Sequence, residues 1–192
     1  MPVGVLAIQG DFAKHLEVLE SLGAEGVEVR TTEALQGVDR LIVPGGESTT
    51  VGLLMERFGL GDAIKRRAAE GMPIWGTCMG MIIMAKAVEG RPNQFSLGLL
   101  DITVRRNAFG AQVHSFEDSV RVEGIQEPVL GVFIRAPVVT ECGKEVKRLA
   151  RYKEQVVAVQ EGVRLGTSFH PELTDDPSMH RYFLALPVHS SR

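Results

Sequence analysis

Residues 73–80 of the chain read Pro-Ile-Trp-Gly-Thr-Cys-Met-Gly, an apolar strand that runs into a cysteine with glycine at the second position on either side. This pattern is typical of a nucleophile elbow, a sharp strand-to-helix turn where glycines relieve crowding and the nucleophile stands exposed. The apolar run 81–86 indicates a buried helix, so aligned peptide dipoles at its N-terminus would favour a Cys78 thiolate. The stretch predicts Cys78 as a nucleophile on a strand–turn–helix unit, with a buried structural cysteine as the alternative.

Around this stretch, apolar strands alternate with amphipathic helices in the first half of the chain. Strands are expected at 3–8, 26–30, 40–43 and 72–75, and helices at 12–22, 49–58 and 62–70. Such alternation favours a mostly parallel sheet covered on both faces. The sequence therefore predicts one α/β domain over residues 1–192, a doubly wound, flavodoxin-like three-layer sandwich with a mixed, mostly parallel central sheet.

After Gly90 the pattern changes to short β-rich pieces. Strands are expected at 99–105, 119–122, 129–133, 138–141, 148–152, 156–160 and 163–168, followed by a closing helix at 176–186. We expect these strands to be antiparallel edge strands and hairpins that complete the sheet.

A cysteine nucleophile needs a base that takes its proton and a third group that orients the base. Residues 167–172, Thr-Ser-Phe-His-Pro-Glu, supply His170 and Glu172 as candidates. In an extended backbone the His-x-Glu spacing turns both side chains toward one place, and Pro171 keeps His170 away from helical dihedrals. Glu172 would then fix the imidazole tautomer and stabilise the imidazolium. A surface histidine followed by a helix-start carboxylate is the alternative.

A third motif occupies residues 41–50, Leu-Ile-Val-Pro-Gly-Gly-Glu-Ser-Thr-Thr, where an apolar strand ends in a glycine pair. Adjacent glycines let backbone N–H groups point into a site, so Gly46 and Met79 are the candidate oxyanion donors. Phosphate binding at a helix N-terminus is the competing function, but the loop has no lysine and Glu47 carries the wrong charge. A tight turn capped by Ser48 or Thr49 is the structural alternative.

Three of the predicted loops leave the carboxyl ends of parallel strands, where ligands bind in open α/β sheets. Gln9, Gly45, Gly46 and Cys78 should therefore gather on one edge of the sheet. The His170 loop must reach the same edge if the triad is real.

The composition excludes some classes of protein but does not identify the function. The net charge of −3 gives no electrostatic footprint for nucleic acid or a membrane surface. The two cysteines are too few for a disulfide framework, and a reactive Cys78 needs reducing surroundings, with Cys142 as a packed bystander. The chain starts directly on a strand and has no apolar run long enough to span a bilayer, so we expect a soluble, cytoplasmic protein.

Together these motifs resemble the class I, or triad, glutamine amidotransferases, which use Cys, His and Glu in that chain order. The resemblance narrows to the glutaminase subunits of pyridoxal 5′-phosphate synthase and covers nearly the whole chain. It is carried by Leu-Ala-Ile-Gln-Gly at 6–10, Pro-Gly-Gly-Glu-Ser-Thr-Thr at 44–50, Gly-Thr-Cys at 76–78, Arg-Asn-Ala-Phe-Gly at 106–110, Phe-Ile-Arg-Ala-Pro at 133–137 and Ser-Phe-His-Pro-Glu-Leu-Thr at 168–174.

The resemblance implies hydrolysis of L-glutamine to L-glutamate and ammonia by Cys78, His170 and Glu172, with no metal or organic cofactor required. It implies six residues in contact with glutamine: Gly46, Glu47, Ser48, Arg106, Ile134 and Arg135. An arginine fork matches the free α-carboxylate of glutamine, and Arg106 is favoured over its neighbour Arg105 for this role.

The resemblance also implies a partner, a separate barrel-shaped synthase subunit that receives the ammonia for vitamin B6 synthesis in a hetero-oligomeric complex. Gln9 and the Gly45–Gly46 loop are where this partner would be sensed. The chain departs from the family pattern at Met79, where a small residue is common, and at His114, where an acidic residue is frequent. Neither departure changes the expected activity.

Two alternatives stay open at this point. A glutaminase subunit that serves another acceptor, such as imidazole glycerol phosphate synthesis, would use the same triad. A non-catalytic, redox-sensing or scaffold protein on the same fold would use Cys78 as a peroxide sensor, because a fold does not fix a function. Such a sensor needs thiolate character but needs neither His170 nor Glu172.

Overall fold

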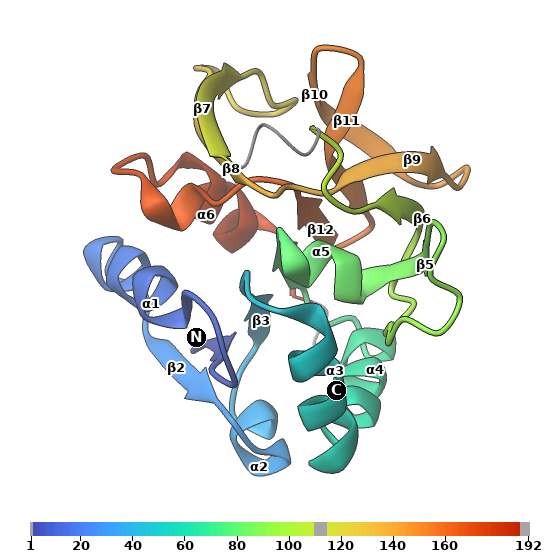
Figure 1. The fold of residues 1–192 in the computed structure, drawn as a ribbon. Helices are drawn as coiled ribbons and strands as arrows, with labels where there is room; N and C mark the ends of the chain where they lie inside the picture. Colours follow the sequence, from blue (N-terminus) through green and yellow to red (C-terminus); the bar gives the residue numbers. More distant parts are fainter. Residues whose placement is uncertain (1, 110–114, 189–192) are drawn as a thin grey trace.

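The computed structural model describes residues 2–109 and 115–188. Its main sheet has ten strands: β1 (Val3–Leu6), β2 (Gly26–Val29), β3 (Arg40–Val43), β4 (Ile74–Thr77), β5 (Ala85–Val88), β6 (Leu100–Arg105), β9 (Val138–Cys142), β10 (Lys147–Tyr152), β11 (Gln155–Glu161) and β12 (Arg164–Thr167). The order is β2-β1-β3-β4-β12-β11-β9-β6-β5, with β10 paired to β11 (Figure 1). A separate two-stranded sheet pairs β7 (Ser115–Val120) with β8 (Val129–Ile134).

Helices cover both faces of the parallel half of the main sheet (Figure 1). They are α1 (Phe12–Ser21), α2 (Thr32–Gln36), α3 (Ser48–Arg57), α4 (Leu60–Ala69), α5 (Met79–Met84) and α6 (Ser178–Ala185), with a 3₁₀ turn η1 (Pro171–Leu173) before α6. None of these helices has the length and apolar content that a bilayer crossing requires, within the part of the chain that the structure describes.

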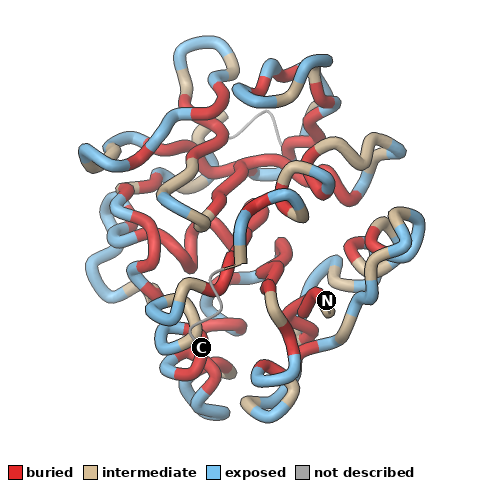
Figure 2. Tube along the Cα trace, turned by 180° about the vertical axis from the view of Figure 1, so that it is seen from behind, coloured by how far each residue is buried: buried red, intermediate tan, exposed pale blue. Residues whose placement is uncertain are grey.

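Two cores arise because side chains alternate between the faces of a strand. In β3, Leu41 and Val43 pack into a core with α3, α4 and α5, whereas Ile42 packs into a second core with α1 and α6. Neighbouring β4 repeats the division, with Ile74 in the first core and Trp75 in the second. The buried segments therefore run through the centre of the molecule in Figure 2, as expected for a three-layer α/β sandwich.

The predicted fold class is confirmed, and the elements of the first half lie within a few residues of their predicted bounds. The later strands were predicted to be antiparallel edge strands and hairpins that complete the sheet, and three pairings depart from this prediction, two because they are parallel and one because it lies outside the main sheet. β12 lies in the middle of the sheet parallel to β4, because the β11–β12 hairpin reverses the chain beside it. β5 pairs with β6 in parallel, and β7 and β8 leave the main sheet altogether. Sequence patterning missed α2 and β5 as elements.

The glycines around Cys78 are required by close backbone packing. A Cβ at Gly80 would overlap the carbonyl oxygen of Val43 in β3, and a Cβ at Gly76 would overlap the backbone of Gly80. The helix that follows the cysteine is therefore pressed directly against the strands beside it. This explains why glycine stands at the second position on either side of Cys78.

We expect Gly80→Ala to lower the free energy of unfolding by about 2 kcal/mol or more, because a fixed carbonyl has no rotamer with which to escape the added methyl group. Chemical denaturation of the purified protein measures this loss. Gly37→Ala is the matched control, since a Cβ there meets nothing closer than 3.5 Å and the backbone φ is −82°. Equal stability of the two variants would contradict the packing argument.

Candidate active site

Cys78 lies in the turn between β4 and α5, with φ 49° and ψ −106°. A positive φ is costly for a residue with a Cβ and is found where the surroundings impose it. Here the Cys78 N–H donates to the carbonyl of Thr167 at 2.7 Å, which ties the turn to the end of β12. The Sγ atom lies 3.8 Å from the carbonyl oxygen of Ile134 at the end of β8. The predicted nucleophile elbow is thus present in the backbone.

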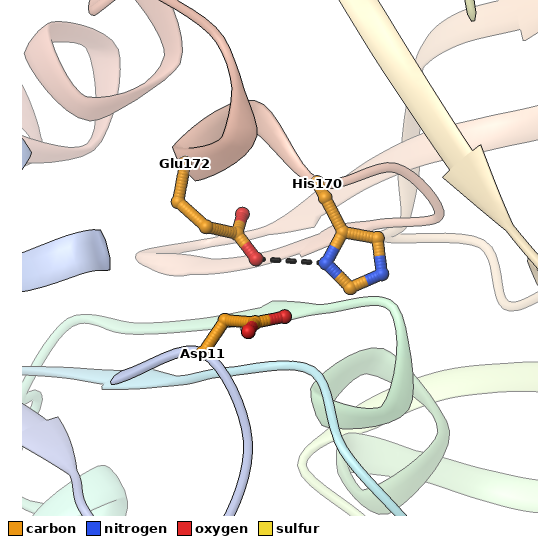
Figure 3. A group of neighbouring side chains, drawn as sticks. All are labelled: Asp11, His170 and Glu172. Atoms are coloured by element: carbon orange, nitrogen blue, oxygen red, sulfur yellow. Dashed lines mark hydrogen bonds and ion pairs between the residues drawn. The ribbon is translucent and has the colours of Figure 1, made fainter. Parts of the chain in front are cut away.

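His170 follows β12 and lies beside the same edge of the sheet. Its N–H donates to the carbonyl of Val132 in β8 at 2.8 Å, and its Nδ1 lies 2.7 Å from Oε1 of Glu172 in η1 (Figure 3). Both residues are buried, at 5% and 3% exposure. Because a buried carboxylate accepts from Nδ1, the imidazole presents Nε2 for proton transfer. His170 is therefore a buried imidazole oriented by Glu172, and not a surface histidine.

The His170 imidazole is held in its protonated form. Burial alone would lower its pKa, but hydrogen bonding and charge attraction from Cys78 and Glu172 outweigh burial and raise the pKa from 6.5 to about 10. The ring therefore lies between the Glu172 carboxylate and the Cys78 thiol, as a group that shuttles protons to and from a cysteine nucleophile must.

A cavity of about 330 Å³ opens over Cys78 and His170. Its walls include all six residues predicted to contact glutamine and both predicted oxyanion donors: Gly46, Glu47, Ser48, Arg106, Ile134, Arg135 and Met79. Arg106 is half-buried and its Nη1 lies 3.3 Å from Oε1 of Gln94, whereas Arg105 is an exposed residue of β6 outside this cavity. Two larger hollows of about 430 Å³ contain neither the cysteine nor the imidazole.

The Gly-Gly-Glu loop is capped differently from the sequence expectation. Neither Ser48 nor Thr49 caps α3; the Glu47 carboxylate does, accepting from the N–H groups of Thr49 at 3.0 Å and Thr50 at 2.7 Å. These backbone hydrogen bonds lower the pKa of Glu47 from 4.5 to about 2. The Glu47 N–H in turn donates to Oε1 of Gln9 at 3.0 Å, so the loop is fixed to the end of β1.

The two glycines of this loop serve close approach, since neither has a positive φ. A Cβ at Gly45 would overlap Cε1 of His170 and lie 3.1 Å from its Nδ1. A Cβ at Gly46 would lie 3.3 Å from Cε of Met79 and 3.4 Å from Oε1 of Gln9. Gly45 thus makes room for the His170 imidazole, and the end of the Met79 side chain lies close to Gly46.

The predicted site residues and the residues that line the cavity overlap without being identical. Glu172, Gln9 and Gly45 were predicted but do not line the cavity; each lies next to a residue that lines it. Asp11, Ile82 and Asn107 line it without having been predicted. Asn107 has φ 49° and Arg135 has φ 45°, and such strain is concentrated at binding sites. The Arg-Asn-x-Phe-Gly segment was the available signal for Asn107. His114 falls outside the described residues.

Asp11, His170 and Glu172 are the one described group with metal-ligand chemistry, since their ligand atoms lie within 4.8 Å of one another (Figure 3). The Nδ1 of His170 and Oε1 of Glu172 are hydrogen-bonded to each other, and Asp11 is exposed. A metal ion at this place would have to break the hydrogen bond that orients the imidazole. The geometry fits an oriented base better than a metal centre.

We expect Gly45→Ala to lower kcat for the expected hydrolysis of glutamine at Cys78 about 10- to 100-fold. The added methyl group would displace the His170 imidazole from its position beside Cys78. Gly46→Ala should have a smaller effect, since the flexible end of Met79 is able to move. Steady-state kinetics with circular dichroism spectra for both variants test this order. A Gly45→Ala variant as active as the parent would contradict it.

We expect Cys78→Ala to lower the pKa of His170, because one of the two groups that favour the imidazolium is removed. The pKa is raised above 6.5 in the parent, so its contribution to folding is complete below pH 6.5 and is lost as pH rises through about 10. NMR titration of the His170 ring follows the pKa, with Cys142→Ala as the control. An unchanged pKa in Cys78→Ala would rule out the coupling.

Comparisons with known proteins agree with this geometry. Residues 5–189 match the SNO glutamine amidotransferase family. A relative from Roseiflexus sp. (strain RS-1), named pyridoxal 5′-phosphate synthase subunit PdxT, is 52% identical over 97% of this chain and 100% of that protein. A relative of the same name from Thermus thermophilus is 54% identical over 96% of each chain.

Comparison with solved structures agrees with the family match. A crystal structure described as a glutamine amidotransferase has a TM-score of 0.92 and 52% identity, and the match covers 96% of this chain and 97% of that one. The structure of PurLQS from Thermotoga maritima shares the fold alone, with a TM-score of 0.68 at 19% identity over 95% of this chain and 97% of that one. With a family match over nearly its full length, the chain belongs to the SNO glutamine amidotransferase family.

Proposed function

We propose that this protein hydrolyses L-glutamine to L-glutamate and ammonia, and that the ammonia serves pyridoxal 5′-phosphate synthesis on a separate synthase subunit. The observation that carries the proposal is a cysteine in a nucleophile elbow that shares one cavity with a histidine oriented by a buried glutamate. The names of the relatives, subunits of pyridoxal 5′-phosphate synthase, support the choice of acceptor. The proposed glutaminase domain spans residues 1–192.

In the first half of the reaction the Cys78 thiolate attacks the side-chain amide carbon of glutamine. A carbon–sulfur bond forms, the carbonyl oxygen becomes an oxyanion, and the tetrahedral species collapses to a thioester as the carbon–nitrogen bond breaks. The His170 imidazolium gives its proton to the departing nitrogen, which leaves as ammonia. Glu172 holds the imidazole through Nδ1 during both proton transfers.

In the second half His170 takes a proton from a water molecule, whose oxygen attacks the thioester carbon. The carbon–sulfur bond breaks, glutamate leaves, and the thiolate and imidazolium are restored. The backbone N–H groups of Gly46 and Met79 are the proposed oxyanion donors in both halves. Two observations support this assignment. Both residues line the cavity beside Cys78, and neither backbone N–H is hydrogen-bonded to another described residue.

The proposed glutamine contacts are Gly46, Glu47, Ser48, Arg106, Ile134 and Arg135. Two arginines line the cavity, and a guanidinium suits the free α-carboxylate of glutamine, which accepts bidentate hydrogen bonds. Arg106 is the better candidate, because it is half-buried and Gln94 supports its guanidinium. An amino-acid substrate also fits the cavity volume of about 330 Å³, at the small end of ligand sites.

The proposed partner is a barrel-shaped synthase subunit in a hetero-oligomeric complex, sensed through Gln9 and Gly45. The support is a set of close neighbours: the Glu47 N–H donates to Gln9, a Cβ added at Gly46 would meet the end of Met79, and a Cβ added at Gly45 would overlap the His170 ring. A shift of Gln9 on docking would move the loop that carries an oxyanion donor. Both cysteines are free thiols, which suits the reducing cytoplasm that we propose as its location.

We expect Cys78→Ala to abolish glutamate release, His170→Asn to lower kcat about 100- to 10,000-fold, and Glu172→Gln to leave a reduced but measurable rate. Glutamate release in the presence of saturating synthase subunit measures all three, and Cys142→Ala is the matched control. An electrophilic glutamine analogue should label Cys78 and spare Cys142. Parent-level turnover in His170→Asn would leave a redox-sensing cysteine as the better explanation.

We also expect hydrolysis to depend on the partner, since ammonia released into water is lost by protonation and diffusion. Titrating the synthase subunit into a fixed amount of this protein should raise glutamate release until the complex saturates. An unrelated barrel enzyme at equal concentration is the control. Full activity in the free subunit, or no complex by sedimentation, would contradict the coupling.

A further inference from the structure

Two histidines that the mechanism above does not use lie behind Glu172. His15 in α1 and His180 in α6 are each 0% exposed. The Nδ1 of His15 lies 2.9 Å from Nε2 of His180, and the Nε2 of His15 lies 3.5 Å from Oε2 of Glu172 and 3.4 Å from Oγ1 of Thr77. A row of polar groups therefore runs from α6 through α1 to the catalytic carboxylate.

The row is enclosed by aromatic side chains. The Trp75 ring meets the His15 ring edge-on with centroids 5.8 Å apart, and meets the His180 ring in the same way at 4.9 Å. Phe183 packs against the Trp75 ring at 5.6 Å. Polar groups in such surroundings are costly unless they are hydrogen-bonded to one another.

Both histidines are neutral at pH 7. Burial, followed by the charges of His180 and His170, lowers the pKa of His15 well below 6.5, and burial lowers the pKa of His180 to about 4. Each ring therefore has one N–H and one lone pair, and the only freedom left is which nitrogen carries the proton.

The contacts favour one assignment of these protons. Oε2 of Glu172 is buried without a hydrogen bond among the described residues, and a carboxylate oxygen can only accept. The nitrogen Nε2 of His15 lies 3.5 Å from it. A proton on Nε2 of His15 gives this oxygen a donor and leaves Nδ1 to accept from Nε2–H of His180. Nδ1 of His180 has no hydrogen-bond partner among the described residues, and in this assignment it carries a lone pair and no proton. The opposite assignment would place a lone pair against a carboxylate and bury an unpaired N–H.

We propose that His15 is a positioning residue for glutamine hydrolysis: its Nε2–H holds the second oxygen of Glu172, while His180 fixes the tautomer of His15. The inference rests on the proposed function and assigns a role to two residues outside the triad. Glu172 then has an imidazole at each oxygen, His170 at Oε1 and His15 at Oε2. An N–H donor beside each oxygen would hinder rotation of this carboxylate away from the His170 ring.

The tautomer is the direct test, and it does not depend on activity. Nitrogen-15 NMR of the histidine-labelled protein, with His15→Gln to assign the signals, should show His15 protonated at Nε2 and not at Nδ1. A His15 ring protonated at Nδ1, or a charged ring at pH 7, would overturn the proposal.

The kinetic test uses paired variants of His15 in complex with the synthase subunit. His15→Leu should lower kcat about 10- to 100-fold with KM for glutamine within about twofold, because a donor to a charged group is lost while the cavity is intact. His15→Gln, whose amide N–H replaces Nε2–H, should recover most of the rate. Leu16→Ala is the control, since Leu16 packs toward Gly26 and should affect stability alone. Equal rates in the Leu and Gln variants would overturn the proposal.

A double-mutant cycle separates positioning from general destabilisation. In a Glu172→Gln background, His15→Leu should cost less than threefold further, because the group through which His15 acts has already lost its charge. His180→Phe, which keeps a ring against Trp75, should lower kcat about 3- to 10-fold and covers the case in which His15→Leu fails to fold. The same fold-loss for His15→Leu in both backgrounds, or parent-level kcat in His180→Phe, would overturn the role of His15. A parent complex that releases no glutamate would instead overturn the proposed function.

Discussion

The site depends on the pairing of β4 with β12. Thr77 and Thr167 are register partners at the ends of these parallel strands, and the next N–H along β4, that of Cys78, donates to the Thr167 carbonyl. This one backbone contact brings Cys78 beside the segment that continues into His170. The proposed nucleophile and base are far apart in sequence and close in space because β4 and β12 are neighbours in the sheet.

Close backbone approach is the second requirement. A Cβ at Gly80 would overlap the Val43 carbonyl and a Cβ at Gly45 would overlap the His170 ring, so α5 packs directly on β3 and the loop after β3 packs directly on His170. This close packing fixes the loops around the cavity. The Glu47 carboxylate caps α3, and a hydrogen bond to Gln9 connects the Glu47 loop to the segment that follows β1. Oxyanion donors need such fixed loops because they act only at a fixed distance from the reacting carbon.

Local patterns predicted the parts of the molecule that local chemistry determines. Residues 73–80 indicated the elbow, and the His-Pro-Glu spacing indicated an oriented base, because in both the functional groups are neighbours in sequence. The place of β12 beside β4 is a long-range choice that a four-residue strand does not encode locally. Likewise His15 reads as one polar residue on an amphipathic helix, and only the packing of α1 against η1 and α6 brings it to Glu172. The Glu47 cap was missed because Ser and Thr are the commoner caps.

The two-stranded β7–β8 sheet has a consequence for how such an enzyme diversifies. Ile134 and Arg135, at and just beyond the end of β8, line the cavity, whereas Cys78 and His170 follow β4 and β12 of the main sheet. β8 meets the catalytic segment through the Val132 carbonyl, a backbone group that any side chain at that position leaves in place. Sequence drift on this ribbon can therefore reshape the substrate wall while the chemistry is inherited unchanged.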